Sequence, residues 1–146
     1  MPRRFVHRHQ PPGPRGSAIK AAIGGLAGIG LVAGAAHLSG APLLIAPFGA
    51  TAVLVFGVPD SALSQPANVI GGHLLASGLG VLAVLLLPET WWAVALAVGL
   101  AIGAMTALRL THPPAGADPI VVMLEQAGPG FLFSPVLIGA LALVAV

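Results

Sequence analysis

The feature that most constrains the fold is a nearly uncharged apolar stretch, which begins after Lys20 and continues to the end of the 146-residue chain. Only 7% of the residues are charged and 57% are hydrophobic, so a water-soluble globule would lack the charged side chains that its surface needs. A helix that spans the hydrocarbon core of a bilayer needs roughly 17–25 mostly apolar residues. The sequence therefore predicts an all-α, polytopic membrane protein with about four to six crossings of the lipid bilayer.

Positive charge is concentrated in front of this stretch. Five of the six basic residues lie within the first twenty positions, and only Arg109 follows them. Residues 1–16 have no apolar periodicity, so we expect a disordered basic tail there and one transmembrane domain at 17–146. Basic segments stay on the cytoplasmic side, which predicts a cytoplasmic N-terminus. Because an apolar span follows directly, membrane insertion explains these basic residues better than nucleic-acid binding does.

The chain also resembles itself at an offset of 67 residues. Residues 47–55 align without gaps to residues 114–122, and 114 − 47 = 67. Each copy follows a glycine-rich apolar segment and precedes another apolar segment, so each repeat holds three elements, at about 17–87 and about 91–146. An odd number of elements makes two such copies inverted in the membrane. We predict a helical bundle of two inverted repeats, each with a broken or half helix.

The topology depends on the short segments 42–58 and 111–127. If both cross the membrane, the tail and Arg109 share the cytoplasmic side. If residues 42–58 only enter and leave on one side, Arg109 lies outside. The concentration of positive charge inside the cell favours the first arrangement.

A candidate binding site follows from the repeat, because Thr51 and Asp118 occupy matching positions and both residue types are good helix N-caps. We expect two half-helices to start there and to turn free backbone N–H groups toward an enclosed cavity. Such helix starts attract a small anion by roughly 0.3–1 kcal/mol each. The alternative is two satisfied helix bends without a ligand. The predicted substrate-binding residues are Phe48, Gly49, Ala50, Thr51, His112, Pro114, Gly116, Ala117 and Asp118.

The ionisable residues inside the apolar stretch need a role. An ionised Asp118 would repel an anion, so it caps its helix, is protonated, or carries protons with the substrate. Asn68, His73 and His112 are predicted to line the pathway. No two of the histidines in or beside the spans lie three or four residues apart, so we expect neither a metal site nor a cofactor. No nucleophile and base can be paired either, which argues against an enzyme.

The motif Thr111-His112-Pro113-Pro114-Ala115-Gly116-Ala117 resembles the signature that gives the HPP family of membrane proteins its name. Residues 65–73 and 48–52 resemble the other characteristic stretches of that family. The resemblance implies an integral membrane protein of bacteria or plastids, here of a bacterial inner membrane, and some plastid and cyanobacterial members are assigned nitrite transport. The chain differs from the common pattern at Ala67 and at Asp118-Pro119, which weakens the transfer of substrate.

These observations predict a transporter or channel for a small inorganic anion, nitrite by resemblance. A homo-oligomer is expected, because so short a chain encloses little cavity by itself. The alternative is a non-transporting scaffold or partner subunit, in which faces of small residues bind other helices. A membrane enzyme is the third possibility.

Overall fold

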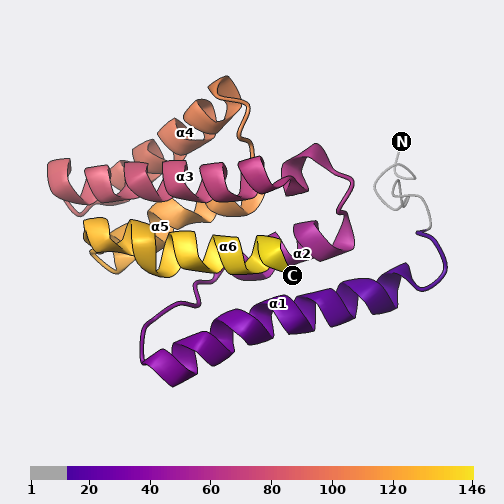
Figure 1. Cartoon of the computed structure of the whole chain (residues 1–146). Helices are drawn as coiled ribbons and strands as arrows, with labels where there is room; N and C mark the ends of the chain where they lie inside the picture. The colour runs from indigo at the N-terminus through magenta and orange to yellow at the C-terminus, as the bar shows by residue number, and fades with distance from the viewer. Residues whose placement is uncertain (1–12) are drawn as a thin grey trace, which may run out of the picture.

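The fold was examined in a computed structural model that describes residues 13–146 (Figure 1). Residues 1–12, most of the predicted disordered tail, lie outside this description. All regular elements from residue 13 onward are helical, so the predicted all-α membrane fold is confirmed. The six main helices are α1 (Ser17–Ser39), α2 (Pro47–Gly57), α3 (Pro66–Leu86), α4 (Trp91–Ala107), α5 (Asp118–Leu124) and α6 (Ile138–Ala145).

Short helical turns connect several of these helices. A 3-10 turn at Pro113–Ala117 leads directly into α5, and another at Ala62–Ser64 precedes α3. A third turn at Pro129–Leu132 and a distorted helical segment at Phe133–Leu137 lead into α6. Each half of the chain thus contains one short helix in its middle, α2 or α5.

Only two of the described helices are long and apolar enough to cross a bilayer by themselves, α1 and α3. Helix α4 has 17 residues, so it is about 25 Å long and slightly shorter than a typical hydrocarbon core. The segment Pro129–Ala145 and α2 are shorter apolar helices.

Proline and glycine set several helix ends. Pro66 and Pro47 occupy the first turns of α3 and α2, where a missing N–H is not needed. Helix α1 ends at Gly40, whose φ of 70° suits glycine and whose N–H donates to the Ala36 carbonyl.

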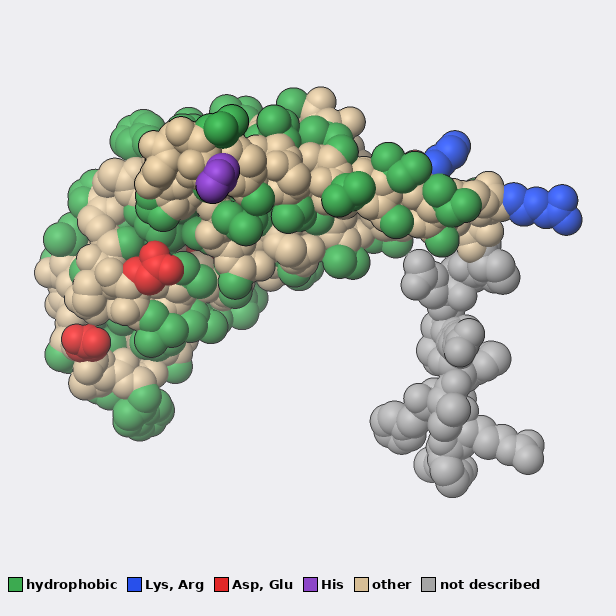
Figure 2. All heavy atoms as spheres, turned by 90° about the horizontal axis from the view of Figure 1, so that it is seen from below, with side chains coloured by type: hydrophobic (Ala, Val, Ile, Leu, Met, Phe, Trp, Pro, Cys, Tyr) green, Lys and Arg blue, Asp and Glu red, His purple; other side chains and the backbone are tan. Residues whose placement is uncertain are grey.

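Helix α3 lies at the centre of the bundle and contacts α4, α5 and α6, whereas α1 lies at the edge against α2 and α6 (Figure 1). Large apolar side chains face outward, among them Leu26, Leu38 and Trp91, which are 76%, 88% and 84% exposed. Figure 2 shows an apolar face with Lys and Arg side chains at one end and Asp and Glu side chains at the other. This surface fits lipid as the surrounding solvent.

Two glycines let elements from different halves of the chain approach closely. A Cβ on Gly72 of α3 would lie 2.8 Å from the Cβ of His112 and 3.1 Å from the Leu110 carbonyl oxygen. A Cβ on Gly139 of α6 would collide with the ring of Phe48 from α2. The two glycines are themselves separated by the repeat offset, since 139 − 72 = 67. Each half therefore packs a glycine of its third element against the other half.

The first prediction concerns this packing. Gly72→Ala should destabilise the protein by roughly 1–3 kcal/mol, because the segment that carries His112 must move away from α3. Gly78→Ala in the same helix is the matched control, since a Cβ there meets nothing within 4 Å. It should be neutral or stabilising by up to about 1 kcal/mol. Thermal unfolding in detergent, followed by far-UV circular dichroism, measures both. Equal stability of the two variants would contradict the close contact.

Candidate functional site

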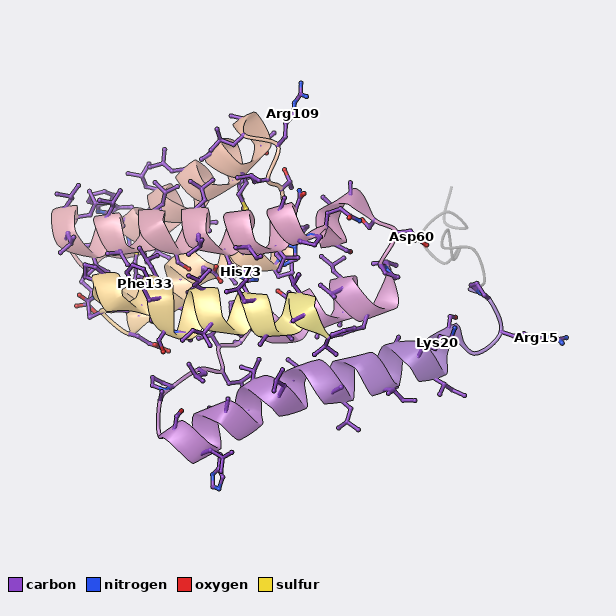
Figure 3. All side chains as sticks on the ribbon, viewed as in Figure 1. Arg15, Lys20, Asp60, His73, Arg109 and Phe133 are labelled. Carbon is purple, nitrogen blue, oxygen red and sulfur yellow. The ribbon has the colours of Figure 1, made fainter. Side chains whose placement is uncertain are left out.

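The centre of the bundle contains a polar cluster of five fully buried side chains. They come from four segments that meet around α3, and their members are Thr51, His73, Ser77, His112 and Asp118. Thr51 lies on α2, His73 and Ser77 lie one turn apart on α3, and Asp118 begins α5. His112 immediately precedes the 3-10 turn that leads into α5. His73 is labelled in Figure 3, between α3 and α6.

The imidazole of His73 joins the two halves of the chain. Its Nε2 lies 2.8 Å from Thr51 Oγ1, and its Nδ1 lies 2.7 Å from Asp118 Oδ2. The hydroxyl of Ser77 donates to the same carboxyl oxygen at 3.1 Å. Thr51 and Asp118 thus hydrogen-bond one ring, so the two matching positions meet at one site.

A second imidazole extends the chain of hydrogen bonds. His112 Nε2 lies 3.0 Å from Thr51 Oγ1, and His112 Nδ1 donates to the Leu63 carbonyl at 2.7 Å. The bonds therefore run without interruption from the Leu63 carbonyl through His112, Thr51 and His73 to the Asp118 carboxyl group.

Aromatic contacts fix the orientation of the rings. The His73 and His112 rings meet edge to face, with centroids 5.0 Å apart and an interplanar angle of 64°. Phe48 packs edge to face on His73, with centroids 5.3 Å apart. Phe48 is itself fully buried and separates the cluster from α6, where it contacts Gly139. The predicted site residue Phe48 thus forms an apolar wall of the cluster.

The prediction that Thr51 and Asp118 cap half-helices is wrong. Helix α2 begins at Pro47, so Thr51 lies one turn inside it and its hydroxyl also donates to the Pro47 carbonyl at 3.2 Å. Asp118 does open α5, but its side chain makes no capping bond and turns to His73 and Ser77 instead. The buried imidazole and hydroxyl bind the carboxyl group in place of the first backbone amides of α5.

The expected free backbone N–H groups are also already bonded at several of these positions. The N–H groups of Phe48 and Gly49 donate to Ile45 and Ala46, and those of Ala115 and Asp118 donate to His112 and Ala115. Tight turns before α2 and α5 use these amides, as is common at helix ends. The helix starts therefore do not present the open anion site that the repeat suggested.

The remaining predicted residues lie around the cluster rather than in it. Pro114 is buried, Gly49 and Ala50 are exposed, and Gly116 has open space where a Cβ would stand. Asn68 is half-buried and donates to the Thr111 carbonyl at 3.0 Å, which holds the start of α3 against the segment that carries His112. Asn68 thus supports the site from outside.

An apolar groove of about 680 Å³ lies on the other side of Thr51 and Asp118. One wall belongs to α2 and the other to the segment around the start of α5, and the lining residues match one to one at the 67-residue offset. The pairs are Ala46 with Pro113, Pro47 with Pro114, Ala50 with Ala117, Val53 with Ile120, and Leu54 with Val121. Equivalent positions of the two copies therefore face each other across the groove.

Sequence reasoning missed Ser77 and the Leu63 carbonyl. The position of Ser77, four residues after His73, could have revealed it, because residues at this spacing share one helix face. The carbonyl has no sequence signal. One atom of the cluster remains unsatisfied: Asp118 Oδ1 is buried without a hydrogen-bond partner. Within residues 13–146, no three His, Cys, Asp or Glu side chains are arranged to hold a metal ion.

Comparison with known proteins shows the family to which the chain belongs. The chain matches the sequence model of the family described as "HPP, transmembrane region" over residues 10–146. It belongs to the HPP family. The motif that resembles the HPP signature contains His112. This histidine links Thr51 to the Leu63 carbonyl in the buried chain of hydrogen bonds.

Two relatives of this HPP protein are transmembrane proteins of Dictyostelium discoideum. One is 42% identical over 107 residues, which cover 68% of this chain and 38% of the relative. The other is 40% identical over 108 residues, which cover 68% of this chain and 35% of the relative. The HPP protein thus spans less than two fifths of the length of either relative. No solved structure matches it.

Proposed function

We propose that this HPP protein is a membrane transporter for a small inorganic anion, rather than an enzyme. Nitrite is the first candidate, because some HPP members are assigned nitrite transport. The observation that carries the proposal is the buried cluster around His73. An ionisable side chain at the centre of a membrane helix costs about 2.5–3.5 kcal/mol on insertion scales, and such residues usually mark a substrate or proton pathway.

The cluster supplies the donors for the anion. Because the first amides of α2 and α5 are already bonded, the imidazoles and the Thr51 hydroxyl are the groups that can turn to a substrate. Of the predicted residues, Ala50, Pro114 and Ala117 line the apolar groove, from which a substrate would approach. Charge-assisted bonds from an imidazolium suit a small oxyanion.

Flux into liposomes tests the proposal. The purified protein should carry nitrite faster than protein-free liposomes do, and nitrate, formate, chloride and bicarbonate offered under the same gradient rank its selectivity. Absence of flux for every one of these anions would contradict transport.

Gly116→Val gives a second test. A Cβ at Gly116 meets nothing within 4 Å, so the variant should fold and assemble normally while its larger side chain narrows the approach to Asp118. We expect flux to fall by about tenfold, equivalent to about 1.4 kcal/mol in the barrier. Normal flux in a correctly assembled Gly116→Val protein would count against this approach.

A scaffold or partner subunit is the second candidate, and open helix faces favour it. A Cβ on Gly99 or Gly103 of α4 would meet nothing within 4 Å, and the same holds for Gly30 and Gly34 of α1. Small residues four apart let another helix approach closely. We propose that such a face binds a second copy of the chain, and Gly99→Val should then shift the detergent-solubilised protein toward the monomer in light scattering. Retained flux in the resulting monomer would show that transport does not need the assembly.

The proposed orientation has a cytoplasmic N-terminus, in the inner membrane of a bacterium. Arg109 then lies on the same side, if each half crosses three times. The chain has no native Cys, so Leu108→Cys, at a side chain that is 60% exposed, can be labelled alone. Labelling from the cytoplasmic side is expected. Labelling only from outside would show that residues 42–58 do not cross.

A further inference from the structure

We propose that the buried cluster holds one exchangeable proton and passes it between His73 and His112 through the Thr51 hydroxyl, so that the anion moves together with a proton. The coupling rests on the proposed transport function. The proton site itself rests on the hydrogen-bond geometry.

The first step fixes the state of His112. The Leu63 carbonyl can only accept a hydrogen bond, so His112 Nδ1 must carry the hydrogen at that contact. In a neutral His112, Nε2 is then an unprotonated acceptor, and it lies 3.0 Å from Thr51 Oγ1. The single hydrogen of Thr51 has two acceptors within reach, this nitrogen and the Pro47 carbonyl at 3.2 Å, and the shorter contact to the nitrogen takes it.

The second step fixes His73. A threonine hydroxyl has one hydrogen, and the donation to His112 uses it. The other imidazole nitrogen at this hydroxyl, His73 Nε2 at 2.8 Å, must therefore be a donor. If Nε2 were unprotonated on both rings, two buried acceptors would share one hydrogen. One of these nitrogens would then be buried without a hydrogen bond.

The third step counts the protons on the pair of His73 and Asp118. With Nε2 protonated, the 2.7 Å contact from His73 Nδ1 to Asp118 Oδ2 is either an imidazolium that donates to a carboxylate or a carboxylic acid that donates to a neutral ring. Both forms carry the same number of protons and no net charge. A pair without net charge is also the state that apolar surroundings favour.

The fourth step moves the proton. His73 Nε2 releases its hydrogen to Thr51 Oγ1 while the hydrogen of Thr51 passes to His112 Nε2. One N–H and one O–H bond break, and one O–H and one N–H bond form. The positive charge then rests on His112, and His73 is left neutral with its Nδ1–H donated to the Asp118 carboxylate. The His112 imidazolium has no carboxylate partner, unlike that of His73, so it can attract an anion.

No other charge within the described residues disturbs this exchange. Thr51 is the group that α2 contributes, His73 and Ser77 come from α3, and Asp118 comes from α5, whereas α4 and α6 contain no titratable side chain. The other charged and titratable side chains from residue 13 onward lie on exposed positions, namely Arg15, Lys20, His37, Asp60, Glu89, Arg109 and Glu125. Asp118 Oδ1, which is buried without a hydrogen-bond partner, is the remaining acceptor at the far end of the chain of bonds.

Thr51→Val and Thr51→Ser form the matched test, because valine keeps the shape of threonine without its hydroxyl and serine keeps the hydroxyl. In liposomes with a pH-sensitive dye inside, the wild-type protein should acidify the lumen as nitrite enters. Thr51→Ser should retain proton movement within about twofold, and Thr51→Val should lose it by at least about tenfold. Nitrite entry without proton movement in the wild type would overturn the relay and leave transport intact.

Nitrogen NMR of histidine side chains judges the proton site even if no anion is carried. His73 Nε2 should carry a hydrogen and His112 Nε2 should not, and Thr51→Val should change both signals. If every flux is absent but these signals are found, the proposed transport function is wrong and the proton site is retained. Unprotonated Nε2 atoms on both rings would overturn the relay whatever the flux.

Discussion

Asp118→Asn should abolish the dependence of anion flux on pH while leaving the protein folded. The amide oxygen can still accept from Ser77 and from His73 Nδ1, the two groups that now meet Asp118 Oδ2. Asparagine cannot be ionised, so a second proton on His73 would give an imidazolium without a counter-charge in an apolar interior. His73 then becomes neutral with a bare Nε2, and the relay through Thr51 stops.

Flux measured over a range of external pH checks this prediction. In the wild type, flux should rise as the external pH falls, because a proton enters with the anion. In Asp118→Asn the proton-driven part should fall by about tenfold or more. Glu125→Gln is the control, since this exposed carboxyl group lies just past the end of α5 and should not change the profile. A variant that carries more anion with an unchanged pH profile would show that Asp118 only repels the substrate.

Much of the fold could be predicted from the sequence because lipid and backbone geometry leave few choices. The predicted transmembrane domain starts at residue 17, where α1 begins, and the predicted second repeat starts at about residue 91, where α4 begins. Gly16 directly precedes α1 and Trp91 opens α4, so both starts are marked by local residues. The start of α2 was missed, since Thr51 looks like an N-cap but Pro47 already begins the helix one turn earlier.

The candidate site could be predicted only in part, because its chemistry depends on pairs that are distant in the chain. The repeat identified Thr51 and Asp118 as candidate site residues. The position of His73 and His112 within apolar segments identified these two as well. No local pattern shows that His73 separates Thr51 from Asp118, or that His112 meets the carbonyl of Leu63. Hydrogen-bond partners of this kind follow from how α3 packs between the two halves.

A double-mutant cycle on His73 and Asp118 should show the largest effect on stability. Each side chain is fully buried, and their contact is 2.7 Å. His73→Leu takes one partner from the carboxyl group, which keeps Ser77, and one from the Thr51 hydroxyl, which keeps His112. Asp118→Leu leaves Nδ1 of His73 without a partner, so each single change should cost about 3–5 kcal/mol. The double change to leucine leaves neither member of the pair unpartnered, although Ser77 and Thr51 each still lose one bond.

The double variant should therefore be more stable than the sum of the two single effects predicts, by about 2 kcal/mol or more. Reversible unfolding in mixed micelles of mild detergent and dodecyl sulphate measures all four proteins. Leucine at both positions also removes His73 and Asp118 from the relay and leaves only His112, so this double variant should carry no proton with the anion however stable it is. Additive costs would mean that His73 and Asp118 do not interact. Strong coupling together with retained proton movement would mean that the pair stabilises the bundle without carrying the proton.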